Sequence, residues 1–113
     1  MAEIGDIVSN NGTRWVVQSF TGAPDGGRLA RLVRPVPYDA HPARLKTKRS
    51  EHHESGLTVV EPFDFPIGST VNTRGGGTAT VIELGVSEVI VASRPGLRTR
   101  IPKWQLVLEN ADV

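Results

Sequence analysis

The chain has 113 residues, no cysteine and a formal net charge of +1 at pH 7, a length that allows one ordinary domain or two very small ones. The lack of cysteine excludes disulfide frameworks, thiol nucleophiles and cysteine-ligated metal centres, and the near-neutral charge means that affinity for a polyanion must come from local charge placement. No segment resembles an export signal or approaches the roughly 20 apolar residues of a membrane span, so we expect a cytoplasmic protein without membrane contact.

A short motif occurs twice, in residues 4–18 and again in residues 67–83. Each copy has an Ile-Gly entry, a valine that closes a short strand, a glycine-rich turn, and a threonine that opens a longer apolar strand. The repeat predicts one small β unit used twice. Because small units bury little surface alone, we expect the two copies to share an interface.

Glycine, proline and β-branched residues dominate, and no window shows sustained apolar recurrence at helical spacing, which predicts an all-β class. In the first unit we expect strands at residues 7–8, 13–20, 28–33 and 57–61. Pro35 and Pro37 should end the third strand, since proline cannot donate to a strand ladder. Alternation along the second strand predicts two opposite rows of side chains, with Trp15, Val17 and Ser19 on one face and Val16, Gln18 and Phe20 on the other.

The apolar pattern is lost over residues 38–56, where we expect a loop or a single helical turn around residues 43–45. The connection between Val33 and Leu57, residues 34–56, has 23 residues, whereas its counterpart between Ala92 and Leu106 has 13. Insertions into a repeated unit usually fall in loops, and loops often carry function. The first unit, residues 1–61, is therefore distinguished by a long insertion.

The connector, residues 62–66, is too short and too apolar for a flexible tether. We expect Phe63 and Phe65 to pack between the units and fix their orientation. The second unit should span residues 67–109, followed by a frayed tail at 110–113. Its expected strands are residues 70–72, 78–84, 88–92, 97–101 and 106–109.

Five short strands, the Gly-Asp-X-Val opening at residues 5–8, and a proline-containing turn at residues 101–105 before a closing apolar pair resemble the SH3-like small barrels. The KOW and Tudor-like group is the most similar. The resemblance covers residues 4–61 and 67–109, although the first unit has no counterpart of Ile101-Pro102. It implies two tandem five-stranded SH3-like barrels that act as a binding module, because such barrels mostly hold nucleic acid, ribosomal elements or peptides and are seldom catalytic.

Basic residues gather in two places. Residues 28–49 hold seven basic residues and one acid, Asp39, and residues 89–108 hold four basic residues and no acid. Two basic surfaces brought together by the fold would contact phosphates; the alternative is that these are solubilising charges on exposed loops and edge strands. The candidate contact residues are Tyr38, Arg44, Lys46, Lys48, Arg49, Arg98, Arg100, Lys103 and Trp104.

Other chemistry has less support in the sequence. His41, His52 and His53 are weak metal candidates, because adjacent histidines point to opposite sides of an extended chain and cysteine is absent. The run at residues 75–77 suits a hairpin tip better than a phosphate loop. No nucleophile, base and orienting acid occur at a recognisable spacing, so we expect no catalytic residues, no cofactor and no enzyme activity.

The sequence thus predicts a non-catalytic binding module that contacts nucleic acid or a nucleic-acid-associated complex through basic loops. The alternative is a structural or assembly protein, of phage or prophage origin, that acts through protein contacts. A small-molecule substrate is not expected. The identity of the partner and the oligomeric state stay open.

Overall fold

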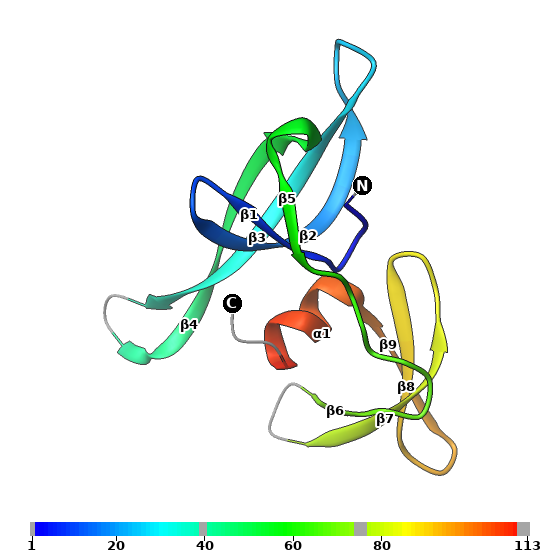
Figure 1. Ribbon diagram of the computed structural model, residues 1–113. Coiled ribbons are helices and arrows are strands. Elements are labelled where there is room, and N and C mark those ends of the chain that lie inside the picture. The colour runs from blue at the N-terminus through cyan, green and yellow to red at the C-terminus, as the bar shows by residue number, and fades with distance from the viewer. Residues whose placement is uncertain (1, 39–40, 74–76, 111–113) are drawn as a thin grey trace.

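The computed structural model describes residues 2–38, 41–73 and 77–110, and for residues 35–46 it describes only the backbone. Two antiparallel sheets account for most of this part of the chain, which confirms the all-β class (Figure 1). No helix in the described ranges is long and apolar enough to cross a membrane.

The first sheet has five strands in the order β4-β3-β2-β1-β5, so the last strand returns to pair with the first. A short 3-10 helix, η1, precedes that last strand. The elements are β1 Ile7–Asn10, β2 Thr13–Gly22, β3 Arg28–Tyr38, β4 His41–His53, η1 Glu54–Gly56 and β5 Thr58–Glu61.

The second sheet has four strands in the order β6-β7-β8-β9 and is followed by one helix. Its elements are β6 Thr70–Asn72, β7 Thr78–Leu84, β8 Glu88–Arg94, β9 Leu97–Pro102 and α1 Lys103–Asn110. Two five-stranded barrels are therefore not what the structure has: the second sheet lacks a fifth strand, and neither sheet closes on itself among the described strands.

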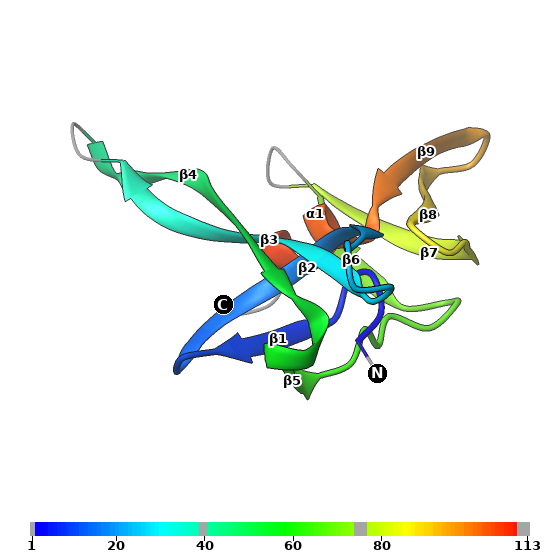
Figure 2. The same ribbon diagram turned by 90° about the horizontal axis from the view of Figure 1, so that it is seen from above.

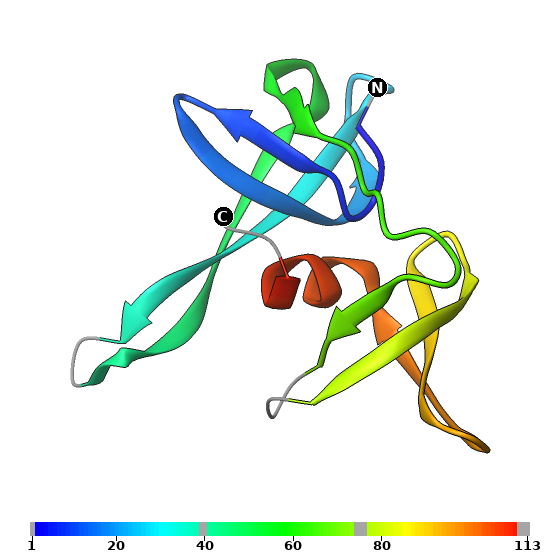
Figure 3. The same cartoon turned by 60° about the horizontal axis from the view of Figure 1, so that its bottom comes forward.

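The strand expected at residues 106–109 is wrong, because these residues lie in α1. The helix occupies the space between the two sheets (Figure 3) and buries two sides at once. Leu106 belongs to the core of the second sheet, whereas Val107 packs with the first. A helix of eight residues is marginally stable on its own, so α1 is stabilised by its burial against both sheets.

The expected stop at Pro35 and Pro37 is also wrong. The loop or helical turn expected over residues 38–56 is wrong for residues 41–53, which form a strand, whereas residues 54–56 do form one 3-10 turn. Strand β3 continues to Tyr38, and β4 pairs with it along this whole length. Pairing of β2 with β3 ends at Val16↔Val33, so beyond that point no described strand pairs with this edge of β3. Residues two apart on a strand direct their N–H groups to the same edge, so Pro35 and Pro37 cost no ladder bond if that edge is the free one, which is the arrangement that tolerates proline in a strand.

The repeat is visible in the backbone hydrogen bonds. The Gly5 N–H donates to Val17 O at 2.9 Å, and the Gly68 N–H donates to Val81 O at 2.8 Å. Both glycines have a positive φ, +91° and +94°, which only glycine adopts readily. The matching pairs Val8↔Trp15 and Val71↔Ala79 extend the correspondence into the strands.

A bulge occurs at the same place in each copy, after Val17 in β2 and after Val81 in β7. The extra residue reverses the alternation of the strand beyond it. Phe20 therefore packs on the core that contains Trp15 and Val17, and not on the opposite face as the alternation predicted.

Three apolar clusters stabilise the molecule. One lies on one face of the first sheet and contains Ala2, Val8, Trp15, Val17, Ala30 and Leu32. A second belongs to the other sheet and contains Val71, Ala79, Val81, Val89, Val91, Ile101 and Leu106. The third contains Ile7, Val16, Val33 and Val107. Phe63 and Phe65, in edge-to-face contact at 5.3 Å between ring centroids, pack against both the second and the third cluster, as expected for residues between the units.

Asp6 fixes the connector to the first unit. Its carboxylate is buried, with 5% of the residue exposed, and accepts hydrogen bonds from the N–H groups of Phe63 and Glu3, both at 2.8 Å. A buried carboxylate that accepts two backbone hydrogen bonds holds its donors firmly. The Phe63 side chain is thereby placed at the junction of the two sheets.

Candidate nucleic-acid interface

The connection that the sequence singled out is a two-stranded ribbon. Because β2 stops pairing at Val33, the rest of β3 has β4 as its neighbour, and Figures 1 and 2 show this hairpin running well beyond the sheet. We call residues 34–49 the basic arm. It holds five basic residues and one acid, a net charge of +4. The other residues hold eight basic and eleven acidic side chains, a net charge of −3, so a cationic ribbon projects from a mildly anionic body.

At the base of the basic arm, Arg34 stacks over Trp15, with 5.6 Å between the guanidinium carbon and the ring centroid. The Arg34 Nε atom is buried and has no hydrogen-bond partner among the described residues. Lys48 faces Arg34 across the two strands, and cross-strand partners lie on the same face of a sheet. Two cationic residues therefore share one face at the point where the arm leaves the sheet, and one of them, Arg34, stacks on an aromatic ring.

Lys48 and Arg49 are exposed, and the described part of the chain gives neither an ion pair. As neighbours on a strand they point to opposite faces, with Arg49 opposite Val33. The other candidates in the arm, Tyr38, Arg44 and Lys46, lie on the paired strands, and their side chains fall outside the described residues. The arm thus presents cations on both faces at its base.

The remaining arginines of the first unit are engaged with carboxylates. Arg28 pairs with Glu54 at 2.9 Å and stacks 3.9 Å from the centre of the Phe20 ring. Arg31 pairs with Glu51 at 3.6 Å. The sequence predicted an excess of positive charge from residue 28 onward. Because Arg28 and Arg31 are paired with carboxylates, the excess of positive charge begins only at Arg34.

The second group of candidates does not join the arm. Arg98 and Arg100 pair with Ala92 and Ile90, which puts them on the outer face of β9, and Figures 1 and 3 show the β8–β9 turn on the opposite side of the molecule from the arm. Lys103 lies 4.8 Å from the centre of the Phe63 ring. Trp104 packs against the cluster between the sheets, so it is no open platform for a base. The two basic groups therefore do not form one continuous surface.

The histidines form no metal centre in the described ranges, where no group of three or more His, Cys, Asp or Glu side chains is placed to hold an ion. His52 and His53 pair with Ala30 and Leu29 and so point to opposite faces. His41 lies in β4, and its side chain is outside the described residues.

His53 instead links two loops. Its Nε2 lies 3.2 Å from Asp25 Oδ1 in the β2–β3 turn, and its Nδ1 lies 2.8 Å from the Ser55 hydroxyl in η1. The Ser55 N–H donates to the same Nδ1 at 3.2 Å, so Nδ1 is the acceptor and Nε2 carries the proton toward the carboxylate. The Gly27 N–H, at 3.0 Å, and His53 lower the pKa of Asp25 below 3.8.

Sequence reasoning counted Arg34 in the basic run and placed Trp15 in a strand, but it did not bring the two together. It also missed the ribbon, for which the i, i+2 spacing of Pro35 and Pro37 was the available signal, since this spacing suits two strands with one free edge. Comparisons of the chain with models of known families, with curated proteins and with solved structures found no match.

Proposed function

We propose that the protein is a non-catalytic nucleic-acid-binding module whose basic arm contacts backbone phosphates. The observation that carries the proposal is the concentration of charge: +4 on residues 34–49 against −3 on all other residues. Cations that protrude from an anionic body meet a polyanion without the rest of the surface having to approach it closely. Phosphate neutralisation of this kind supplies most non-specific affinity for nucleic acid.

The shape of the arm favours a B-form duplex. Beyond Arg34, β3 has four more residues, a reach of about 13 Å at the rise of an extended strand. The major groove of B-DNA is about 12 Å wide and admits a two-stranded ribbon, whereas the A-form groove of RNA is deep and too narrow for side chains to read. The arm would lie in or across that groove, with Arg34 and Lys48 on the phosphates at its edge.

The strand order of the first sheet supports the SH3-like assignment for the first unit alone. A meander of four strands followed by a 3-10 turn and a last strand that pairs with the first gives the topology of such a barrel. The second unit, with a helix in the place of its last strand, would be a variant of the same plan.

The test is fluorescence anisotropy with a labelled 20-base-pair duplex at low salt. The wild-type protein should bind, and the triple variant Lys46→Ala, Lys48→Ala, Arg49→Ala should bind at least about tenfold more weakly, because each lost cation removes a phosphate contact. Lack of binding by the wild-type protein, or equal binding by the variant, would refute the proposal.

A structural or assembly role is the second candidate, and the edge strand β5 favours it. All four of its residues are exposed, among them Val59 and Val60. No described strand pairs with the outer edge of β5, and such an edge can pair with another chain. Light scattering during size-exclusion chromatography separates the candidates. A defined oligomer that ignores the duplex would favour assembly.

A further inference from the structure

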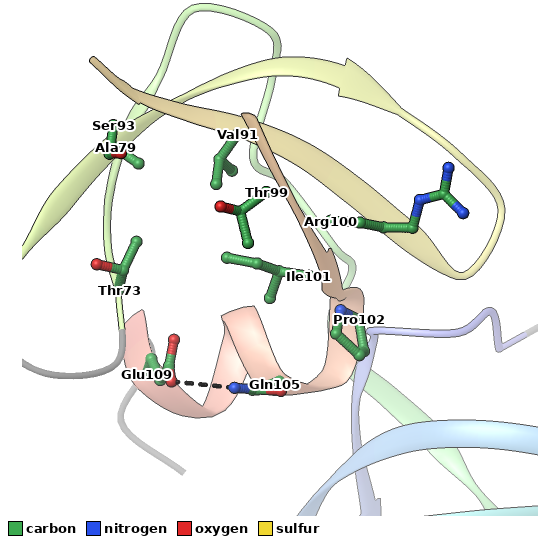
Figure 4. A pocket seen from close by; sticks show the side chains of 10 residues that line it. All are labelled: Thr73, Ala79, Val91, Ser93, Thr99, Arg100, Ile101, Pro102, Gln105 and Glu109. Atoms are coloured by element: carbon green, nitrogen blue, oxygen red, sulfur yellow. Dashed lines mark hydrogen bonds between the residues drawn. The ribbon is translucent and has the colours of Figure 1, made fainter. Parts of the chain in front are cut away.

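A cavity of about 310 Å³ opens on the inner face of the second sheet, beside α1 (Figure 4). Its floor is apolar and consists of Ala79, Val91 and Ile101. Hydroxyl groups of Thr73, Ser93 and Thr99 surround it, and Gln105 and Glu109 line it from the helix. The volume lies at the lower end of the range of small-ligand sites, which combine an apolar lining with a few convergent polar groups.

The strand pairing shows which residues of the first unit correspond to this cavity. Val17↔Leu32 corresponds to Val81↔Val91, and Leu32↔Ser50 corresponds to Val91↔Thr99. This register equates Ala79, Val91, Thr99 and Ile101 of the cavity with Trp15, Leu32, Ser50 and His52. Ser93 corresponds to Arg34 by position along the strand, two residues after Val91 and Leu32, although the pairing of β8 with β9 shifts at Ser93 and that of β3 with β4 does not shift at Arg34.

In the first unit, therefore, this place is filled by the chain itself. The Trp15 ring occupies it, and the guanidinium of Arg34 lies over that ring. In the second unit an alanine and a serine stand at the two positions, which removes both the ring and the cation. The cavity lies at the place where the first unit has the side chains of Trp15 and Arg34.

Glu109 adds a negative charge to the site. Its Oε1 accepts a hydrogen bond from the Gln105 amide at 3.4 Å, and its Oε2 is buried without a partner among the described residues. A buried carboxylate oxygen without a donor is costly, and a charged donor satisfies it best. Arg100 does not supply this donor, since its side chain points away from the cavity in Figure 4.

From the shape, the correspondence and the unpaired oxygen together, we propose that this cavity binds a guanidinium group on a short apolar stem. The stem lies on Ala79 and Val91, where the first unit has its tryptophan. The planar cation donates to Glu109 Oε2 and to the hydroxyl of Thr99 or Ser93. Such a group belongs to a free arginine-like metabolite or to an arginine side chain of a partner protein. The site is independent of the basic arm and of nucleic-acid binding.

The test is a titration of the ¹⁵N-labelled protein with n-butylguanidinium, followed by NMR. N-butylurea, which has nearly the same shape and no charge, is the matched probe. Shifts should concentrate on the amides of Ala79, Val91 and Thr99 and on the Gln105 side chain. The cation should bind at least about tenfold more tightly than the urea, a difference of about 1.4 kcal/mol.

Two variants and one control make the test specific. Glu109→Gln should abolish the preference for the cation, whereas Glu83→Gln, which removes an exposed carboxylate outside the cavity, should leave it unchanged. Ser93→Arg restores the first unit's arginine and should block both probes. N-acetylarginine methylamide binding more tightly than free arginine indicates a protein side chain as the natural ligand, and the reverse order indicates a metabolite. Equal binding of cation and urea, shifts elsewhere, or no shifts at 20 mM, on the order of the weakest useful affinity, would overturn the proposal.

Discussion

Gly5 and Gly68 have the same backbone conformation in different surroundings. A Cβ atom on Gly5 would lie 2.9 Å from Phe63 Cδ2 and 3.0 Å from Lys103 Cβ, whereas a Cβ on Gly68 would meet nothing within 4 Å. Gly5→Ala should therefore reduce the free energy of unfolding by more than Gly68→Ala does. We expect about 1–2 kcal/mol for the positive φ at each site and a further 1–3 kcal/mol for the steric clash at Gly5.

Denaturant unfolding of the two variants measures this difference directly, because the strain from the positive φ is common to both. Equal losses would show that the Phe63 contact does not constrain Gly5. The repeat alone predicts two equivalent glycines. The distinction between them arises from the docking of the connector and α1, which no local sequence pattern encodes.

Asp25 should titrate below 3.8, since the Gly27 N–H and His53 both stabilise its charged form and lower its pKa. A carboxyl group whose folded pKa is depressed stabilises the protein above its unfolded pKa, and that contribution is lost as the pH falls through the folded pKa. The effect belongs to the acid range below about pH 4. In the variant His53→Gln, the pKa of Asp25, measured by NMR titration of its carboxyl group, should move upward but remain lowered, because the Gly27 hydrogen bond is kept. An unchanged midpoint would contradict the assigned contact.

Among the elements, α1 is the one that joins the two sheets. Leu106 is fully buried against the second sheet, so Leu106→Ala should cost about 2–5 kcal/mol of unfolding free energy. Leu84→Ala removes the same atoms from a side chain that is 42% exposed and should cost under about 1 kcal/mol. Chemical denaturation of both variants measures the two losses of unfolding free energy. Losses of similar size would mean that the helix does not stabilise the core.

The basic arm is an element that the body does not need. We expect that replacing residues 35–47 by Asn-Gly, a two-residue turn that closes on the pair Arg34↔Lys48, leaves the melting temperature within about 4 °C of the wild-type value. The same variant should bind the duplex more weakly, because it lacks Arg44 and Lys46. A large loss of stability, measured by circular dichroism on heating, would show that the arm packs on the body.

Most strands could be predicted from the sequence, but the helix that ends the second unit could not. Strands β6 and β7 have the expected bounds because alternation and flanking turns specify them locally. Residues 106–108, Leu-Val-Leu, form a short apolar run that fits a closing strand by analogy with the first unit, yet residues 103–110 form a helix because two sheets bury opposite sides of it. Tertiary burial overrode a short local pattern there, as it does where β4 pairs with the proline-containing part of β3.

At the scale of the whole molecule, charge is distributed unevenly over a thin and extended shape. The principal extents are 47 × 36 × 20 Å, and the arm and the β8–β9 turn lie on opposite sides. The sequence located the two basic groups along the chain. It could not show that they are separated, because the relative placement of the sheets depends on contacts of Phe63, Phe65 and α1 across long sequence distances.

The salt dependence of duplex binding tests the central claim most directly, by comparing two variants that lose the same number of charges. One is the arm triple variant Lys46→Ala, Lys48→Ala, Arg49→Ala, and the other is Arg94→Ala, Arg98→Ala, Arg100→Ala on the β8–β9 hairpin. In a plot of log affinity against log salt, the arm variant should flatten the slope by about 2–3, and the hairpin variant should change it by less than about 1. Equal changes in the two slopes, or a larger change in the hairpin variant, would contradict the arm as the phosphate-binding element.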